Sequence, residues 1–475
     1  MQTANLQRNL SVRMLGMITI GGSIGTGIFL ASGNALYIAG PGGVMVAYLV
    51  TSILVYFLMA CLCEMAAFMP SSGSFYVYAA KFVDPALGYA LAWNYWYSWA
   101  IGIAAEISAA ALIMRFWFPD IPSFVWCSVF ITTIVGFNVF STMIFGEVEY
   151  WLSLIKIVII IIFISFGTML VSGMTGFHPA GIKYWTMGDA PFHGGWFTLF
   201  SAFIIAGYSF QGTELIAVAA GETRQPESSV PRAMKQVFWR LFIFFILTIF
   251  IMTLLVPYTA SELMNDNITT SPLIYVLREY GSAFAASFIN VFILVAILSA
   301  GNTGMYASSR MLWYLAKKGH MPAIFSRVSK RGIPVYAIVA TMLVSSTTFL
   351  SSIYGNGAVY FWLINAASVS GFIAWFGIAI SHYRFRQAYV NQGRELSKLP
   401  YLAKGYPYNA LSVLGLSFVI IVGQNMLALA SLQMDWKGML LSCSGVIIFI
   451  TLWLGYKWIH KTKIVKLSEC DFDMT

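Results

Sequence analysis

Long apolar segments separated by short polar connections run along nearly the whole chain of 475 residues. Most of them contain at least the ~20 residues that an α-helix needs to cross the hydrocarbon core of a bilayer. The pattern therefore predicts an all-α membrane protein with twelve transmembrane helices. The predicted spans are residues 14–40, 43–67, 88–116, 122–142, 150–173, 196–221, 237–257, 284–314, 335–353, 358–381, 408–430 and 438–459.

The first predicted span is interrupted by glycine and hydroxyl residues over residues 18–30, which read ITIGGSIGTGIFL. Each glycine weakens a helix by about 1 kcal/mol relative to alanine, and a membrane interior holds no water to satisfy a free backbone. The pattern predicts two half-helices around an unwound middle that lines a wet cavity. The second half-helix would offer its N–H groups to an anion such as a carboxylate. One alternative is a small-residue packing seam; a dinucleotide loop fits poorly because the glycine order differs.

Residues 207–214 (GYSFQGTE) interrupt the sixth predicted span in the same way. Spans one and six cross in opposite directions in this topology, and such paired breaks are typical of inverted repeats that meet at a midplane binding site. The packing seam then becomes the weaker alternative. We predict a single domain over residues 1–475, with a first repeat at about 14–173, a second at about 196–381 and two additional helices at about 408–459.

Composition and charge narrow the class of protein and its orientation. Apolar residues make up 59% of the chain and charged residues 9%, whereas soluble domains carry about 25% charged residues. The net charge of +9 would indicate nucleic acid as a partner in a soluble protein. Here the Lys and Arg residues gather at both termini and in the connections at about 222–240, 310–331 and 384–404. The positive-inside rule therefore places both termini in the cytoplasm, and we expect no nucleic-acid partner.

Several short motifs mark the chain. They are the interrupted first span, Pro41-Gly42-Gly43, and the segments WNYW (93–96), FQGTE (210–214) and AAGE (219–222). In this order they resemble the amino acid permeases of the amino acid–polyamine–organocation (APC) superfamily, and residues 299–308 and 371–386 resemble the lysine-specific members. The resemblance covers essentially the whole chain. It implies a LeuT-like 5+5 inverted repeat with discontinuous helices 1 and 6, in a bacterial cytoplasmic (inner) membrane.

Glu106 lies deep in the third predicted span, where an ionisable group costs about 2.5–3.5 kcal/mol and so requires a reason. Asn94, Ser98 and Gly102 precede it at intervals of four residues and give that helix a small, polar face. The functional interpretation is a carboxylate that faces the cavity and pairs with a substrate ammonium. The structural interpretation is a protonated side chain bonded to a neighbouring helix. Similar permeases for uncharged substrates share this glutamate, so it would also suit the α-amino group or proton coupling.

Two more ionisable residues are candidates for proton coupling beside Glu106. Lys156 lies just inside the fifth predicted span, and the resemblance implies that it occupies the place of sodium in sodium-coupled relatives. The alternative is a side chain that snorkels to the cytoplasmic interface. Glu214 lies at the second break and would bridge the broken helix or carry protons.

The resemblance also implies which groups bind the substrate. Backbone N–H groups around Gly25, Thr26 and Gly27 would hold the α-carboxylate, and carbonyls near Gly22, Ser23, Tyr208 and Ser209 the α-ammonium. Glu106, Gln211, Asn302 and Ser368 would receive the side chain. Asn302 and Ser368 would equally serve as hydrogen bonds between helices. Tyr208 and Phe210 border the second break, where an aromatic ring would attract an ammonium.

The function implied by the resemblance is proton-coupled secondary active transport that imports L-lysine by alternating access. The driving force would be the proton gradient, without a cofactor, and the partners would be the substrate and membrane lipid. Alternatives are a permease for histidine, arginine or a neutral amino acid, or a lysine transporter that doubles as a nutrient sensor with a regulatory membrane partner. We expect no enzyme, because the sequence shows no catalytic nucleophile–base pair and no metal-ligand cluster. An ion channel is disfavoured because no filter sequence appears.

Overall fold

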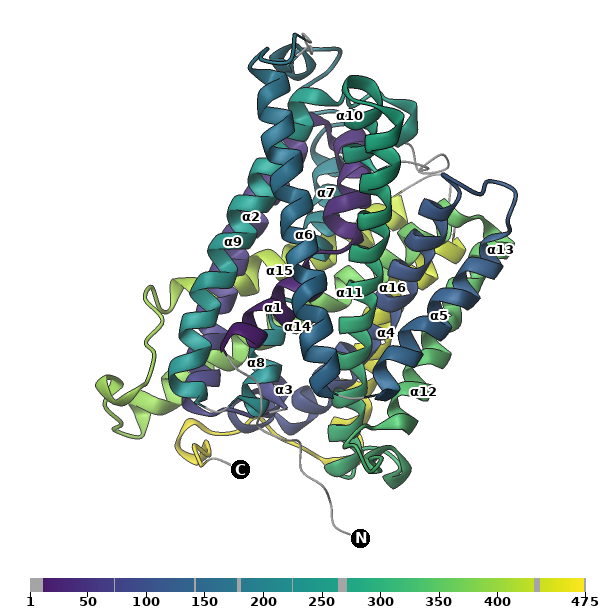
Figure 1. Cartoon of the computed structure of the whole chain (residues 1–475). Coiled ribbons are helices and arrows are strands. Elements are labelled where there is room, and N and C mark those ends of the chain that lie inside the picture. Colours follow the sequence, from purple (N-terminus) through teal and green to yellow (C-terminus); the bar gives the residue numbers. More distant parts are fainter. Residues whose placement is uncertain are drawn as a thin grey trace.

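The computed structural model describes residues 12–71, 73–140, 142–176, 181–223, 225–263, 271–430 and 436–473. Within these ranges every regular element is a helix and no β-strand is present. The helices stand together as a bundle (Figure 1). Nine helical runs in the described chain are long and apolar enough to cross a membrane, and the apolar helices over Ser123–Val139 and Tyr408–Gln424 are shorter. The chain is therefore a multi-pass membrane protein.

The α-helices follow one another with short connections. Their bounds are α1 (Val12–Ser23), α2 (Ser32–Phe68), α3 (Ser74–Phe82), α4 (Pro85–Met114), α5 (Ser123–Phe140), α6 (Thr142–Val171), α7 (Trp196–Phe210), α8 (Leu215–Val218), α9 (Pro226–Leu255), α10 (Pro272–Tyr280), α11 (Ala283–Lys317), α12 (Val335–Ser345), α13 (Ser351–Tyr354), α14 (Asn356–Asn391), α15 (Tyr408–Ala430) and α16 (Trp436–His460). One π-helical turn, η1 (Gly27–Ala31), precedes α2, and 3-10 turns connect several other helices.

The long apolar run Arg13–Phe68 is divided at Gly40. Gly40 has φ 73° and ψ 174°, a left-handed conformation that other residues rarely adopt, and Pro41 follows it. The connection before α7 packs onto this point: the N–H of Gly42 donates to the carbonyl of Pro191 at 2.8 Å, and the N–H of His193 donates to the carbonyl of Ala39 at 3.1 Å. The division falls where the sequence predicted the boundary between the first two spans.

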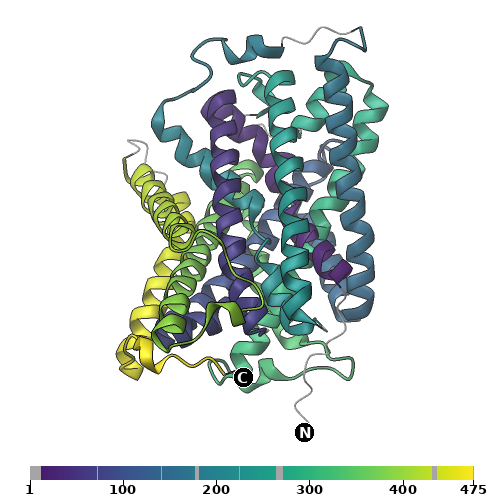
Figure 2. The same ribbon diagram turned by 90° about the vertical axis from the view of Figure 1, so that its left-hand side faces the viewer.

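Three elements form the interior of the bundle. The most apolar stretches of three elements are almost fully buried: those of α4, of the run containing α7 and α8, and of α14. By contrast, the most apolar stretches of α6, α12 and α16 are mostly exposed. In addition, α4 packs directly against α11 and α14. Figure 2 shows α15 and α16 along the outer side of the bundle. A polar group on α4 is thus shielded from lipid and faces other helices.

A buried ionic cluster joins α2 to α14 near one end of the bundle. The guanidinium of Arg386 donates to both carboxylate oxygens of Glu64, with 2.7 Å between Nη2 and Oε2. Nε2 of His382 lies 3.4 Å from the same carboxylate, and the N–H of Ala403 donates to it at 2.6 Å. Glu64 and His382 are fully buried. This group of residues, the Glu64 cluster, holds α2, α14 and the connection that follows α14 together.

Candidate functional site

The two interrupted helices meet at their breaks. Helix α1 ends at Ser23 and the chain becomes helical again at Gly27, while α7 ends at Phe210 and α8 begins at Leu215. Gly212 has φ +97°, and a Cβ atom there would lie 2.8 Å from the carbonyl carbon of Gly22. Only glycine satisfies both this left-handed conformation and this close approach. The two unwound segments therefore pack backbone against backbone.

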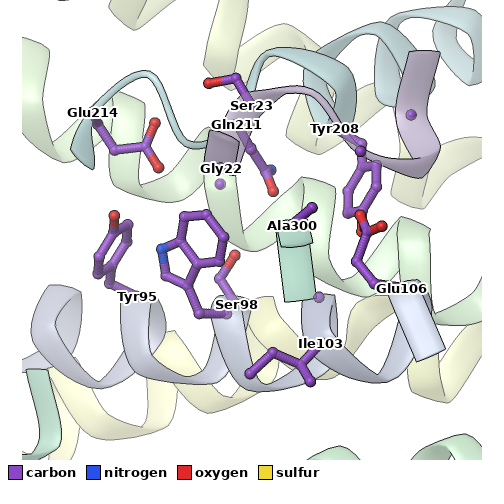
Figure 3. A pocket seen from close by; sticks show the side chains of 15 residues that line it. Gly22, Ser23, Tyr95, Ser98, Ile103, Glu106, Tyr208, Gln211, Glu214 and Ala300 are labelled. Carbon is purple, nitrogen blue, oxygen red and sulfur yellow. The ribbon is translucent and has the colours of Figure 1, made fainter. Parts of the chain in front are cut away.

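A small cavity lies between the two breaks and the helices α4, α11 and α14. Its volume is about 30 Å³, room for about two water molecules. An amino acid enters only when the surrounding helices separate. Figure 3 shows how side chains from both breaks and from α4 point toward the cavity. The lining residues are Gly22, Ser23, Gly25, Gly27, Tyr95, Ser98, Trp99, Gly102, Ile103, Glu106, Tyr208, Gln211, Glu214, Ala300 and Gly371.

Glu106 on α4 contacts both broken helices. Its carboxylate accepts hydrogen bonds from the N–H of Thr26 at 3.1 Å and from the hydroxyl of Thr26 at 3.2 Å. The hydroxyl of Tyr208 donates to the same carboxylate at 3.0 Å (Figure 3). The free N–H groups at the start of a helical segment attract an anion. The Glu106 carboxylate thus lies on the Thr26 N–H, one of the groups that the resemblance assigns to a substrate α-carboxylate.

Glu214 and Gln211 connect the second break to α14. The carboxylate of Glu214 accepts the N–H of Gly212 at 3.2 Å and the indole N–H of Trp375 at 3.4 Å. Glu214 therefore joins the second break to Trp375 on α14. The amide of Gln211 donates to the carbonyls of Ala367 and Ser368 at 3.1 and 3.0 Å. These contacts couple the position of the unwound segment to that of α14.

Lys156 on α6 contacts the backbone of the first break. Its Nζ donates to the carbonyl of Gly21 at 2.5 Å and lies 4.0 Å from Oε1 of Glu149. Both side chains are fully buried, so Lys156 does not snorkel to the interface. Glu149 in turn accepts a hydrogen bond of 2.5 Å from the hydroxyl of Ser299 and one of 3.5 Å from the amide of Asn302. A buried cation and a buried anion thus stand directly behind the last turn of α1.

Five of the predicted substrate residues do not line the cavity. One is Thr26, whose N–H and hydroxyl are bound to Glu106, and the side chains of the other four contact neighbouring helices. Asn302 donates to Glu149 and accepts from Asn138 at 2.6 Å. The hydroxyl of Ser368 donates to the carbonyl of Ile204 at 2.7 Å, and the hydroxyls of Ser209 and Tyr48 lie 2.8 Å apart. The fourth, Phe210, packs against the rings of Tyr48 and Phe245. In this conformation these four side chains hold helices together around the site.

Sequence reasoning missed Glu149 as a member of the site. Glu149, Ser153 and Lys156 recur at intervals of four and three residues, which places them on one face of α6. Ser153 donates to the carbonyl of Met17 at 2.9 Å. This polar face in an otherwise apolar span could have identified Glu149 from the sequence. Tyr95, Trp99 and the other apolar lining residues carry no comparable signal, because aromatic and aliphatic residues are abundant throughout the chain.

Metal-binding side chains are not grouped in the part of the chain that the structure describes: no three His, Cys, Asp or Glu residues there could hold one ion. None of the five cysteines forms a disulfide. The polar groups of the site are instead backbone amides, hydroxyls, carboxylates and one ammonium, which suit a zwitterionic organic solute.

Comparison with known proteins gives the same family along nearly the whole chain. The family model described as amino acid permease matches residues 15–469. The chain is 46% identical to the lysine-specific permease LysP of Escherichia coli (strain K12), over 99% of this chain and 97% of that protein. It is 43% identical to LysP of Lactococcus lactis subsp. cremoris, over 98% and 92%, and 40% identical to the histidine permease HisP of the same organism, over 98% of both. The chain belongs to the amino acid permease family of the APC superfamily.

Proposed function

We propose that this protein imports L-lysine across the bacterial cytoplasmic membrane by proton-coupled alternating access. The observation that carries the proposal is the contact of the Glu106 carboxylate with the Thr26 N–H inside a cavity between two broken helices. Broken helices at a midplane site are the means by which LeuT-like transporters bind a substrate carboxylate and ammonium. Relatives that are 46% and 43% identical are named lysine-specific permeases, which favours lysine as the substrate.

In this proposal the α-carboxylate of the substrate takes the N–H groups around Gly25, Thr26 and Gly27. It replaces the Glu106 carboxylate there and releases that side chain to face an ammonium group of the substrate. Carbonyls of Gly22, Ser23, Tyr208 and Ser209 receive the α-ammonium. Charge-assisted hydrogen bonds are about twice as strong as neutral ones. Because one carboxylate replaces another, the N–H groups of the unwound segment keep a charged acceptor throughout the exchange.

Entry of the substrate also rearranges the wider pocket. The amide of Gln211 turns toward the substrate side chain, and Asn302 and Ser368 reach the pocket only when the helices separate. The ring of Tyr208 closes over the bound ammonium, with Phe210 packed behind it. These movements open the cavity from the about 30 Å³ that it has in this conformation.

We further propose the finer architecture that this mechanism requires. Twelve spans would form a LeuT-like 5+5 inverted repeat, with repeats at about 14–173 and 196–381 and additional helices at about 408–459 in a single domain. The direct contact between the breaks at Gly22 and Gly212 supports this arrangement, because the two interrupted helices of such repeats cross at the binding site.

Proton coupling is assigned to Lys156, Glu106 and Glu214, with Glu149 as the partner of Lys156. A lysine that donates to the Gly21 carbonyl stabilises the end of α1 most strongly while its amine is protonated, because charge-assisted hydrogen bonds are about twice as strong as neutral ones. Loss of the proton to one side of the membrane would free α1 to move. The proton gradient then biases the direction of the movement, and no cofactor is required. An inside-negative potential also favours entry of a cation by about 2.3 kcal/mol per charge per 100 mV.

The orientation follows from the distribution of positive charge. The connections that follow α8, α11 and α14 and the segment after α16 lie at the lower end of the bundle in Figure 1, and they carry most of the Lys and Arg residues. We place this end in the cytoplasm. Residues 1–11 lie outside the described part of the chain, so the cytoplasmic N-terminus rests on the positive-inside rule alone.

The test is uptake of radiolabelled lysine by proteoliposomes under an inward proton gradient. Unlabelled lysine, arginine, histidine, ornithine and leucine serve as competitors, and a protonophore shows the dependence on the gradient. Competition led by lysine, with accumulation abolished by the protonophore, is expected. Competition led by another amino acid would overturn the substrate, and accumulation that survives the protonophore would overturn the coupling.

Histidine is the specific rival substrate, because a relative that is 40% identical over 98% of the chain is named a histidine permease. A sensor with a regulatory membrane partner is the rival of another class. Uptake by the purified protein alone separates transport from a function that requires such a partner.

A further inference from the structure

A second cavity opens at the other end of α4, away from the site between the breaks. Its volume is about 490 Å³, and it lies between the first turn of α4, the connection that follows α11 and the last three turns of α16. Tyr89 and Tyr456 form one wall, with ring centroids 4.5 Å apart in a stacked arrangement. The rings of His320 and His460 lie 5.3 Å from Tyr89 and 4.2 Å from Tyr456, respectively. We call this cavity the α16 groove.

Lys318 gives the polar end of the α16 groove a positive charge, and the imidazoles of His320 and His460 add hydrogen-bonding groups beside it. No lining residue is acidic. The nearby carboxylate of Asp84 is bound by Nζ of Lys457 at 2.8 Å, so it does not offset the charge of Lys318. The pKa of His320 is lowered by partial burial and then by the neighbouring His460 and Lys318. An anion between these side chains would relieve the repulsion.

The remainder of the α16 groove is apolar and follows the helix into the bundle. Leu452 and Ile459 line it, and the lining runs from Thr451 to His460, which is about 14 Å at 1.5 Å per residue. Trp458 in the last turn is 84% exposed, as expected for an aromatic residue at the membrane–water interface. Lys318 and the two histidines therefore lie at headgroup level, and the apolar part of the groove lies beside the acyl chains.

We propose that the α16 groove binds an anionic phospholipid, with the phosphate between Lys318, His320 and His460 and an acyl chain along Leu452 and Ile459. Basic pockets between spans at the cytoplasmic face suit anionic headgroups, and a groove that continues into the apolar layer suits a lipid rather than free phosphate. The bound lipid joins α16 to α4 and to the end of α11. Because α4 carries Glu106 and α11 carries Ala300 of the central cavity, the lipid stabilises helices that build the transport site.

The test measures retention of dioleoyl phosphatidylglycerol by the delipidated full-length protein in a neutral detergent, by native mass spectrometry. The parent is compared with the variant Lys318→Gln/His320→Gln/His460→Gln. A control, Lys330→Gln/Lys398→Gln/Lys466→Gln, removes three exposed cations that lie outside the groove. We expect the dissociation constant to rise about fivefold from the loss of the Lys318 charge and further from the loss of the two imidazoles. The control variant and binding of dioleoyl phosphatidylcholine should remain unchanged.

A second variant keeps every charge and fills the groove. Gly455 lines it, and a Cβ atom there would meet no other atom within 4 Å, so Gly455→Leu is tolerated by the backbone and should also weaken retention of the lipid. Equal affinity of both groove variants and the parent would overturn the proposal. Displacement of the lipid by equimolar inorganic phosphate would overturn it as well, because the groove would then be a phosphate site.

Discussion

The ammonium of Lys156 donates a hydrogen bond of 2.5 Å to the carbonyl of Gly21, in the last turn before the first helix breaks. Without this donor the carbonyl would lack its partner at membrane depth. Glu149, 4.0 Å from the ammonium, compensates its charge. The end of α1 is thus held by one side chain of α6.

Lys156→Ala should uncouple uptake from the proton gradient while substrate binding and exchange persist. The substitution removes the donor to Gly21 but leaves the cavity lining intact. We expect gradient-driven accumulation to fall at least about tenfold, equivalent to about 1.4 kcal/mol. Counterflow with lysine on both sides of the proteoliposome measures exchange separately. Lys183→Ala, in the exposed turn η2 (Gly181–Trp185), is the control; accumulation that survives in Lys156→Ala would remove the residue from coupling.

Glu106→Gln should severely reduce accumulation. An amide keeps the size of the side chain but replaces a charge-assisted acceptor for Thr26 and Tyr208. Hydrogen bonds to charged groups contribute about 1.5–3 kcal/mol, so uptake should fall at least about tenfold. Initial rates over a range of lysine concentrations separate affinity from turnover, with the exposed Glu227→Gln as control. Near-normal uptake with unchanged affinity would exclude Glu106 from the site.

Gly212→Ala should destabilise the protein and abolish transport. The φ of +97° is unfavourable for alanine, and the new methyl group would lie 2.8–3.0 Å from atoms of Gly22 and Ser23. The left-handed conformation alone costs about 1–2 kcal/mol. Thermal unfolding in detergent measures the loss. Gly415→Ala in α15 is the matched control, because its Cβ would meet nothing within 4 Å and alanine favours helix. Equal unfolding midpoints would show that the breaks do not require this contact.

The contributions of Glu64 and Arg386 to the stability of the protein should depend on each other. Arg386→Leu leaves the buried Glu64 carboxylate without its strongest partner, and breaking a buried ion pair costs about 3–5 kcal/mol. Glu64→Leu leaves Arg386 uncompensated in the same way. We expect the double variant to lose less stability than the sum of the single variants, measured as free energies of unfolding in mixed micelles. The exposed Arg327→Leu should change little; strictly additive losses at positions 64 and 386 would contradict a direct pair.

The breaks and Glu106 could be predicted from the sequence because their signals are local. Clustered glycine in an apolar segment marks an unwound stretch wherever the neighbouring helices lie. The interval of four between Asn94, Ser98, Gly102 and Glu106 marks one face of a helix. The last three residues line the cavity, whereas the amide of Asn94 donates to the carbonyl of Ser370 at 2.7 Å.

The partners of each polar face could not be predicted, because they lie far away in the sequence. Glu149 bonds to Ser299, 150 residues later. The pattern identified Asn302 and Ser368 as polar face residues, but only the packing of the helices shows that they bond to neighbouring helices in this conformation. The alternative interpretation of Lys156 as a snorkelling residue does not hold, because its side chain is fully buried and contacts the Gly21 carbonyl.

The Glu64–Arg386 pair joins residues 322 positions apart, and this separation has a consequence for biosynthesis. The span that carries Glu64 enters the membrane long before the ribosome has made its partner. A nascent chain therefore holds the Glu64 carboxyl group without its cation until α14 has been made. A chain truncated before α14 would lack that cation permanently, so we expect the truncated chain to fold less stably than the full-length protein.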